Sequence, residues 1–293
     1  MRRVLNFTSG VIEPRPAGRY PWRMVTGQRP VGELLREWRK RRRWSQLDLA
    51  CEADISARHL SFVETGRSRP SRGMVLHLAD RLEVPMRERN GLLLAAGYAP
   101  NFAERRLDDP ALAAARGFVE LVLDRQRPYP AYALDRHWTI VASNGALPEL
   151  NDGVAEFLLR PPVNVLRLCL HPQGLAPRIV NLAEIREHLL FRLRRQIELS
   201  GDPELRRLLG ELTQYPVPDG THDDAAGSDA IAVPFTIDTA LGRLSFLTTT
   251  TVFGTPLDVT LAELALELFF PADIATAAAV AQRAGREIVA AAE

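Results

Sequence analysis

The chain is poor in cysteine and has no long apolar run. Its 293 residues include two cysteines, Cys51 and Cys169, which stand far apart in the sequence. Each lies in apolar surroundings, so we expect small core residues rather than a disulfide or a nucleophile. No stretch of about 18 apolar residues occurs, which argues against a transmembrane helix, and no signal-peptide-like stretch opens the chain. These absences predict a cytoplasmic protein with no membrane partner.

The sequence also lacks the short motifs on which common catalytic and metal sites depend. It has no nucleophile elbow, no phosphate-binding glycine loop and no metal-ligand motif. Cys169 and His171 stand two apart, which on a helix turns them to different sides. His222, Asp223 and Asp224 could bind a metal, but their segment is composed like an ordinary linker loop. We therefore predict no enzyme, no required cofactor and no metal site.

The net charge of +1 conceals a strong asymmetry along the chain. Residues 29–106 contain 16 Lys and Arg against 10 Asp and Glu, whereas residues 107–293 contain 16 against 25. Residues 1–28 add 5 basic residues against 1 acidic residue. A basic segment gains affinity for a polyanion by releasing counterions, and an acidic segment is repelled from it. The charge distribution therefore predicts that the first part of the chain meets nucleic acid and the second does not.

The stretch Ser45–Arg67 is typical of two short helices joined by a tight turn. Ser56 is suited to cap the second helix, because its hydroxyl can accept from one of the free amides that open it. Arg58 stands near the exposed N-terminal end of that helix and could reach base edges in the major groove. The predicted inward-facing residues are Leu47, Leu49, Ala50, Ile55, Leu60 and Val63. These features predict a helix-turn-helix.

The longer run Val31–Pro85 resembles the XRE (Cro/repressor-type) DNA-binding domain. The residues that carry the resemblance, in the family's order, are Ser45, Gln46, Leu49, Ala50, Ser56, Ser61, Glu64, Gly66 and Arg67. The resemblance implies that Gln46 and Ser56 contact the DNA backbone, while Ala57, Arg58, Ser61 and Phe62 face the bases. Because the Glu64 carboxylate would repel phosphate, we expect Arg39 or Arg67 as its partner. The predicted DNA-binding residues are Arg43, Ser45, Gln46, Ser56, Ala57, Arg58, His59, Ser61, Phe62, Arg67 and Arg69.

The second part of the chain alternates between helical and strand-like patterns. Helices are predicted over Pro110–Gln126, Leu182–Leu199 and 272–291. A pair of strands is predicted within residues 129–144, and apolar residues alternate over Ile231–Ile237, Leu244–Thr250 and Leu264–Phe270. The last of these segments is rich in helix-forming Ala, Leu and Glu. We still expect a strand there, because the period of two is unbroken up to Pro271.

This order of elements is typical of a PAS-like fold, in which helices and a five-stranded antiparallel sheet surround a cavity. Together with the stretches YALDRHWTIVASN, NVLRLCLHPQGLAPRIVN and TPLDVTLAEL, it resembles the MmyB-like transcription regulators. That resemblance implies a small apolar ligand, for example a fatty acid. The expected fold class is α+β, with an all-α, lambda-repressor-like head of five helices before the PAS-like domain. The expected divisions are an arm at 1–28, the head at 29–98, a linker at 99–109 and the PAS-like domain at 110–293.

Large apolar groups and a few cations are predicted to line the ligand cavity. Arg178, His188 and Arg192 are candidates to anchor a carboxylate, and His188 and Arg192 stand one turn apart on a predicted helix. The predicted apolar wall residues are Phe118, Val122, Tyr132, Trp138, Ile140, Leu166, Phe191, Phe235 and Phe246.

The sequence thus predicts a homodimeric regulator on the nucleoid of a bacterium, with ligand binding modulating its affinity for double-stranded DNA. A two-fold dimer would read a pseudo-palindromic operator with half-sites roughly 34 Å apart. One alternative keeps DNA binding but leaves the second domain only to dimerise or to contact partner proteins. Another is an antitoxin-like adaptor that binds protein rather than DNA.

Overall fold

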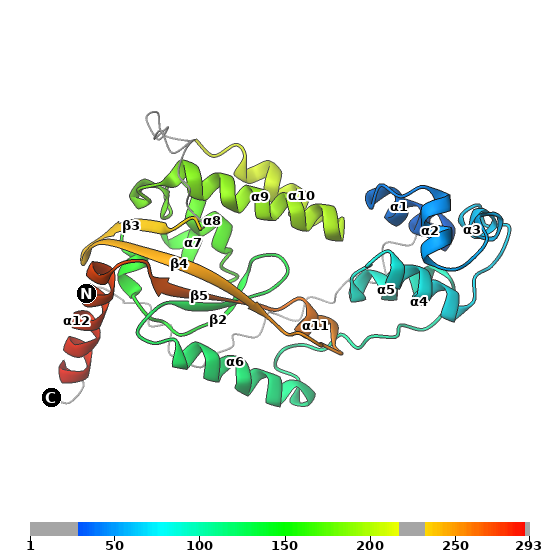
Figure 1. Cartoon of the computed structure of the whole chain (residues 1–293). Helices are drawn as coiled ribbons and strands as arrows, with labels where there is room; N and C mark the ends of the chain where they lie inside the picture. The colour runs from blue at the N-terminus through cyan, green and yellow to red at the C-terminus, as the bar shows by residue number, and fades with distance from the viewer. Residues whose placement is uncertain (1–28, 217–231, 291–293) are drawn as a thin grey trace.

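The computed structural model describes residues 29–216 and 232–290, with side chains described up to residue 285. Its first part is all helical, as predicted (Figure 1). The elements are α1 (Val31–Arg41), α2 (Gln46–Glu52), α3 (Ala57–Glu64), α4 (Arg72–Arg81) and α5 (Met86–Ala95). The predicted arm at 1–28 and the His222–Asp224 segment lie outside the described residues.

Polar caps and left-handed residues set the bounds of these helices. The hydroxyls of Ser45, Ser56 and Ser71 each accept a backbone N–H from the first turn of α2, α3 and α4, which satisfies donors that the helix leaves free. Asp54 and Glu83 adopt positive φ just beyond α2 and α4. The caps thus keep α2 and α3 as two separate helices of a helix-turn-helix. Both pack on one apolar core that includes Leu35, Leu49, Leu60, Val63, Val75 and Leu78.

Two predictions about α2 are wrong. Leu47, expected on its inner face, is 63% exposed, and Cys51, expected in the core, is exposed. Each stands two residues from Leu49, which is about 200° around a helix of 3.6 residues per turn. Because Leu49 points into the core, both neighbours must point away from it.

The second part consists of an antiparallel sheet with helices, in the predicted order of elements. Its five strands are β1 (Ala131–Leu134), β2 (Ile140–Ser143), β3 (Phe235–Thr239), β4 (Gly242–Val252) and β5 (Ala265–Pro271). Their order across the sheet is β2-β1-β5-β4-β3. The helices are η1 (Pro110–Leu112), α6 (Ala113–Arg125), η2 (Pro148–Asn151), α7 (Glu156–Leu159), α8 (Val165–Leu170), η3 (Ala176–Arg178), α9 (Leu182–Ser200), α10 (Pro203–Leu212), α11 (Val259–Ala262) and α12 (Ile274–Ala290). The fold class is therefore α+β.

The sheet is covered on both faces, with α6 on one side and α8, α9 and α10 on the other (Figure 1). Ala133 and Leu266 pack towards Val119 on α6. On the opposite face, Phe246 and Phe269 belong to the larger core that contains α8 and α9. A strand between two such layers buries both sets of its alternating side chains.

The prediction of a strand at β5 was correct, but the burial of its side chains differs in part from the alternating pattern. Leu264, Leu266 and Leu268 pack on the side of α6, as an apolar face should. Phe270, expected with them, is 41% exposed. Glu267 and Phe269, on the other face, are buried, because the helices cover that face as well.

The helical head contacts the second part through both α1 and α5. Arg87 on α5 pairs through both nitrogens of its fork with Glu263, which follows α11. The guanidinium of Arg41 on α1 packs so closely on Gly201, after α9, that a Cβ there would overlap it. Within the described ranges no helix combines the length and apolarity needed to cross a membrane.

Candidate functional site

The exposed side of α3 gathers positive charge around one aromatic ring. The guanidinium of Arg58 lies 5.4 Å from the centre of the Phe62 ring, and that of Arg67 lies 6.0 Å from it. Both arginines are exposed, whereas Phe62 is half-buried. An arginine near the start of a recognition helix can pair with guanine in the major groove. This surface is the candidate DNA-reading face.

The predicted DNA-binding residues differ in their exposure to solvent and in whether they already have a hydrogen-bond partner. Those exposed are Arg43, Ser45, Ser56, Arg58, Arg67 and Arg69, and those half-buried are Gln46, Ala57, His59, Ser61 and Phe62. Gln46 donates one amide hydrogen from Nε2 to Glu64 Oε2 at 2.8 Å, which leaves its second amide hydrogen for a phosphate. Arg69 is engaged inside the head, since it donates to Ala96 O at the end of α5 at 2.9 Å.

A buried ion pair lies directly behind the candidate DNA-reading face. Arg39 Nε donates to Glu64 Oε1 at 2.6 Å and Arg39 Nη2 donates to Glu64 Oε2 at 2.8 Å. Of the two partners expected for Glu64, the structure selects Arg39, which is 7% exposed. Burial by itself raises the pKa of Glu64, but the hydrogen bonds from Arg39 and Gln46 bring it below its ordinary value. The pair links α1 to α3 and orients Gln46.

Two arginines of the basic run after Arg39 also have structural roles. Arg42 donates to Leu82 O and Glu83 O at the end of α4, where carbonyls lack partners within the helix. Arg41 pairs with Glu37 and faces the second part of the chain. Arg43, by contrast, is exposed. We expect Arg43 rather than Arg41 or Arg42 to contact phosphate.

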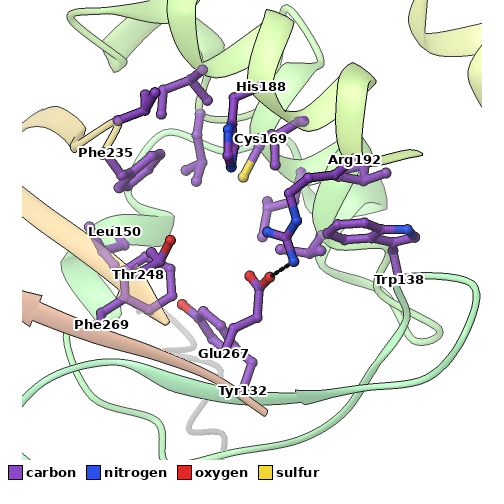
Figure 2. Close-up of a pocket in the computed structure, with 17 residues that line it drawn as sticks. Tyr132, Trp138, Leu150, Cys169, His188, Arg192, Phe235, Thr248, Glu267 and Phe269 are labelled. Carbon is purple, nitrogen blue, oxygen red and sulfur yellow. Dashed lines mark ion pairs between the residues drawn. The ribbon is translucent and has the colours of Figure 1, made fainter. Parts of the chain in front are cut away.

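A pocket lies between the sheet and the helices α8 and α9 (Figure 2). The space within it is about 740 Å³ when its open mouth is included. Most of its wall is apolar. The lining residues are Tyr132, Trp138, Leu150, Val165, Leu166, Leu168, Cys169, Leu175, Ile185, His188, Leu189, Arg192, Val233, Phe235, Thr248, Glu267 and Phe269.

Half of the predicted ligand residues line this pocket, namely Tyr132, Trp138, Leu166, His188, Arg192 and Phe235. Phe118 and Val122 do not, because both lie on α6, across the sheet from the pocket. Phe118 is 48% exposed and packs against Phe253, and Val122 packs in the core beneath α6. Their placement in the wall was wrong, since the sheet separates the two cores.

The remaining predictions fail for local reasons. Phe191 points outward from α9 and is 60% exposed, whereas Phe246 is fully buried in the core. Ile140 packs against that core without reaching the pocket. Arg178 donates to the backbone oxygens of residues 149 and 150 at η2. It therefore holds a loop rather than a ligand.

One end of the pocket is polar and carries a paired charge. Arg192 Nη2 lies 2.8 Å from Glu267 Oε1 (Figure 2). Arg192 also donates to Thr250 Oγ1 at 3.1 Å, and its guanidinium lies 4.7 Å from the centre of the Trp138 ring. Glu267 was not among the predicted ligand residues, because a charged residue in an alternating strand is typical of a solvent-facing side. The signal available was Phe269, which shares its face.

Other ionisable groups around the polar end are uncharged near neutral pH. Burial raises the pKa of the Cys169 thiol to about 12 and raises the pKa of Tyr132 well above its ordinary range. Partial desolvation, together with the positive charge of Arg192, lowers the pKa of His188. The Arg192–Glu267 pair is therefore the charged component of this end of the wall.

The turn between β1 and β2 reaches from the pocket to the helical head. Trp138 lines the pocket with φ of 64°, and its Nε1 donates to Gln196 Oε1 at 2.7 Å. Gln196 in turn donates to Arg136 O at 2.7 Å. Arg136 Nη1 lies 3.4 Å from Asp202, and 3.9 Å from each of Glu88 on α5 and Glu263.

The acidic groups at this junction are strongly perturbed. Burial raises the pKa of Glu88 to about 7. Burial alone would raise the pKa of Asp202 too, but a hydrogen bond from His137 and the charge of Arg136 lower it to about 2. Near neutral pH, Arg136 thus faces a charged Asp202 and a partly protonated Glu88.

Comparison with known proteins identifies both parts of the chain. The helix-turn-helix domain family matches residues 30–92. The family described as MmyB-like transcription regulator ligand binding domain matches residues 115–282. A search of curated proteins found no significant match. With α2 and α3 in the helix-turn-helix match and the pocket in the other, the chain belongs to the MmyB-like transcription regulator ligand binding domain family.

Proposed function

We propose that this chain is a homodimeric, sequence-specific regulator whose pocket takes a small apolar molecule, a fatty acid or a similar compound, and that ligand binding alters its affinity for a pseudo-palindromic operator. The observation that supports this proposal is the turn 135–138. It places a pocket residue, Trp138, two positions from Arg136, which faces Glu88 of the head. A ligand in contact with Trp138 therefore acts on a segment that adjoins the DNA-binding helices.

The strained backbone of Trp138 makes this turn a suitable transmitter. A bulky residue at positive φ is uncommon and costs free energy, and here two hydrogen bonds through Gln196 hold it in place. A ligand that shifts the Trp138 indole must also move Gln196 or break its bonds. Couplings of this kind are typically about 1–3 kcal/mol, enough to change operator occupancy.

Native and denaturing mass spectra of the purified protein test the proposal, followed by DNA titrations with and without the released molecule. We expect a mass lost on denaturation and a change in DNA affinity when the molecule is restored. A bare polypeptide whose DNA affinity no apolar molecule changes would favour a second domain that only dimerises. Absence of any salt-dependent DNA affinity would favour the adaptor, because phosphate contacts release counterions.

Substitutions on the candidate DNA-reading face test its role in DNA binding separately. Arg58→Ala should reduce discrimination between operator and unrelated DNA by about 1–3 kcal/mol, because base contacts specify sequence. Gln46→Ala should weaken binding to all sequences similarly, because a phosphate contact carries no sequence information. Arg160→Ala, which removes an exposed arginine of the second part, serves as the control. If Arg58→Ala bound every duplex as the parent does, the reading face would lie elsewhere.

A further inference from the structure

The polar end of the pocket has no net charge before any ligand enters. We infer that the pocket selects ligands in an electrically neutral form whose head group donates a hydrogen bond to Glu267, such as an aliphatic alcohol or a protonated carboxylic acid, and that it excludes the carboxylate anion. The inference rests on the ligand pocket of the proposed function and defines the chemistry of its occupant. It departs from the sequence-based expectation that a free cation anchors a carboxylate.

Arg192 is already committed on three sides. Glu267, the Thr250 hydroxyl and the face of Trp138 each contact its guanidinium. A ligand carboxylate that paired with Arg192 would have to share its single positive charge with Glu267. The cavity would then hold two carboxylates against one guanidinium.

Glu267 can still accept a hydrogen bond from a ligand. Its side chain is 8% exposed, and it points into the pocket (Figure 2). Although Arg192 lies within ion-pair distance, no described residue gives Oε1 a hydrogen bond. A buried carboxylate oxygen without a donor costs free energy, so a donor on the ligand would stabilise the complex. This orphaned acceptor distinguishes Glu267 from a carboxylate that only neutralises Arg192.

The other elements around Glu267 supply no compensating charge. Tyr132 on β1 and Cys169 on α8 remain protonated, because their pKa values are raised. His188 on α9 is mostly neutral at pH 7 and above, because its pKa is lowered, and β4 contributes the uncharged Thr248 to the wall. An uncompensated buried charge is costly. A carboxylic acid must therefore bring its proton with it.

This condition makes acid binding depend on pH. An aliphatic acid ionises at about the pH at which a glutamate does, near 4.3, so its protonated fraction falls about tenfold for each unit of pH above that. We expect the affinity for decanoic acid to fall about tenfold from pH 7 to pH 8. The affinity for decanol, which has the same chain length and a hydroxyl head, should stay constant.

The test is displacement of an apolar fluorescent probe from the full chain by decanol and by decanoic acid at both pH values. In Glu267→Gln, Arg192 is released to pair with the anion, so decanoic acid should bind with less than about a threefold dependence on pH. Glu187→Gln, which changes an exposed carboxylate of α9 outside the pocket wall, should behave as the parent. If Glu267→Gln does not fold, the pH dependence of the parent still decides.

The outcomes separate the inference from the proposed function. Decanoic acid that binds the parent as tightly as decanol at pH 8, with no pH dependence, would overturn the inference and leave the ligand pocket standing. A probe that neither compound displaces would contradict both. A selective loss of acid affinity with rising pH, relieved in Glu267→Gln, would support both.

Discussion

Replacing Glu64 with alanine should strongly destabilise the helical head while the sheet domain remains folded. Removal of one partner from a buried ion pair leaves the other charge without compensation and typically costs about 3–5 kcal/mol. Arg39 would lose both bonds from its fork to Glu64, and Gln46 would lose the acceptor of its amide. Because whole domains are stable by only about 5–15 kcal/mol, the head would retain little stability. Specific DNA binding should be lost with it.

Hydrogen exchange of peptides from 31–64 is the direct measurement, because it reports the opening of this region alone. Protection there should fall by about two to four powers of ten, whereas peptides from β1 and β5 should keep theirs. Glu52→Ala, which removes an exposed carboxylate from α2, should change protection little. The double variant Arg39→Met with Glu64→Leu should recover much of the loss, since an apolar pair of similar size leaves no buried charge. Unchanged exchange in Glu64→Ala would mean that the pair does not stabilise the head.

The same pair gives the head a defined dependence on pH. The folded-state pKa of Glu64 lies below its ordinary value of 4.5, so its contribution to stability is fully present above that value. It is lost as the pH falls through the lower, folded-state pKa. We therefore do not expect this pair to respond to pH in the neutral range, where Glu88 titrates.

Local patterns predicted the elements of the fold well, for physical reasons. The helix-turn-helix follows from hydroxyl caps and from the spacing of Leu49, Leu60 and Val63, which are short-range signals. β5 formed as a strand against the helical preference of its Ala, Leu and Glu residues, because its period of two places Leu266 on the side of α6. The outward turn of Leu47 and Cys51 could have been predicted from the phase of Leu49, which the pattern of apolar residues alone does not fix.

The pocket was harder to predict, because its wall depends on which layer each face of the sheet meets. Apolar size alone does not separate Phe118, which lies beyond the sheet, from Phe235, which lines the cavity. His188 and Arg192 were found from their spacing on one helix. Glu267 was missed, because the sequence does not reveal that helices also cover its side of β5. The contact between Arg39 and Glu64, which lie on distant elements, was predicted only because the Glu64 carboxylate requires a cationic partner.

Replacing Arg136 with glutamine should uncouple the pocket from DNA while each site still binds. Arg136 is the cation that faces Glu88 of the head together with Asp202 and Glu263 of the second part. Its loss should be tolerated, because Asp202 keeps His137 at 2.9 Å and Glu263 keeps Arg87 at 2.8 Å. The movement of the turn would then no longer be transmitted to α5. The effect of ligand on DNA affinity, typically about 5- to 150-fold, should fall to near one.

The coupling is measured as a ratio of DNA affinities with and without ligand, and again as a ratio of ligand affinities with and without operator. Thermodynamic linkage requires the two ratios to be equal, so a parent protein in which they disagree would not be at equilibrium. Arg125→Gln, which removes an exposed arginine at the end of α6, should leave the coupling intact. If Arg136→Gln also kept it, transmission would have to run elsewhere. The contact of Arg41 with Gly201 at the end of α9 would then be the path to test, because α9 also carries Arg192 and Gln196.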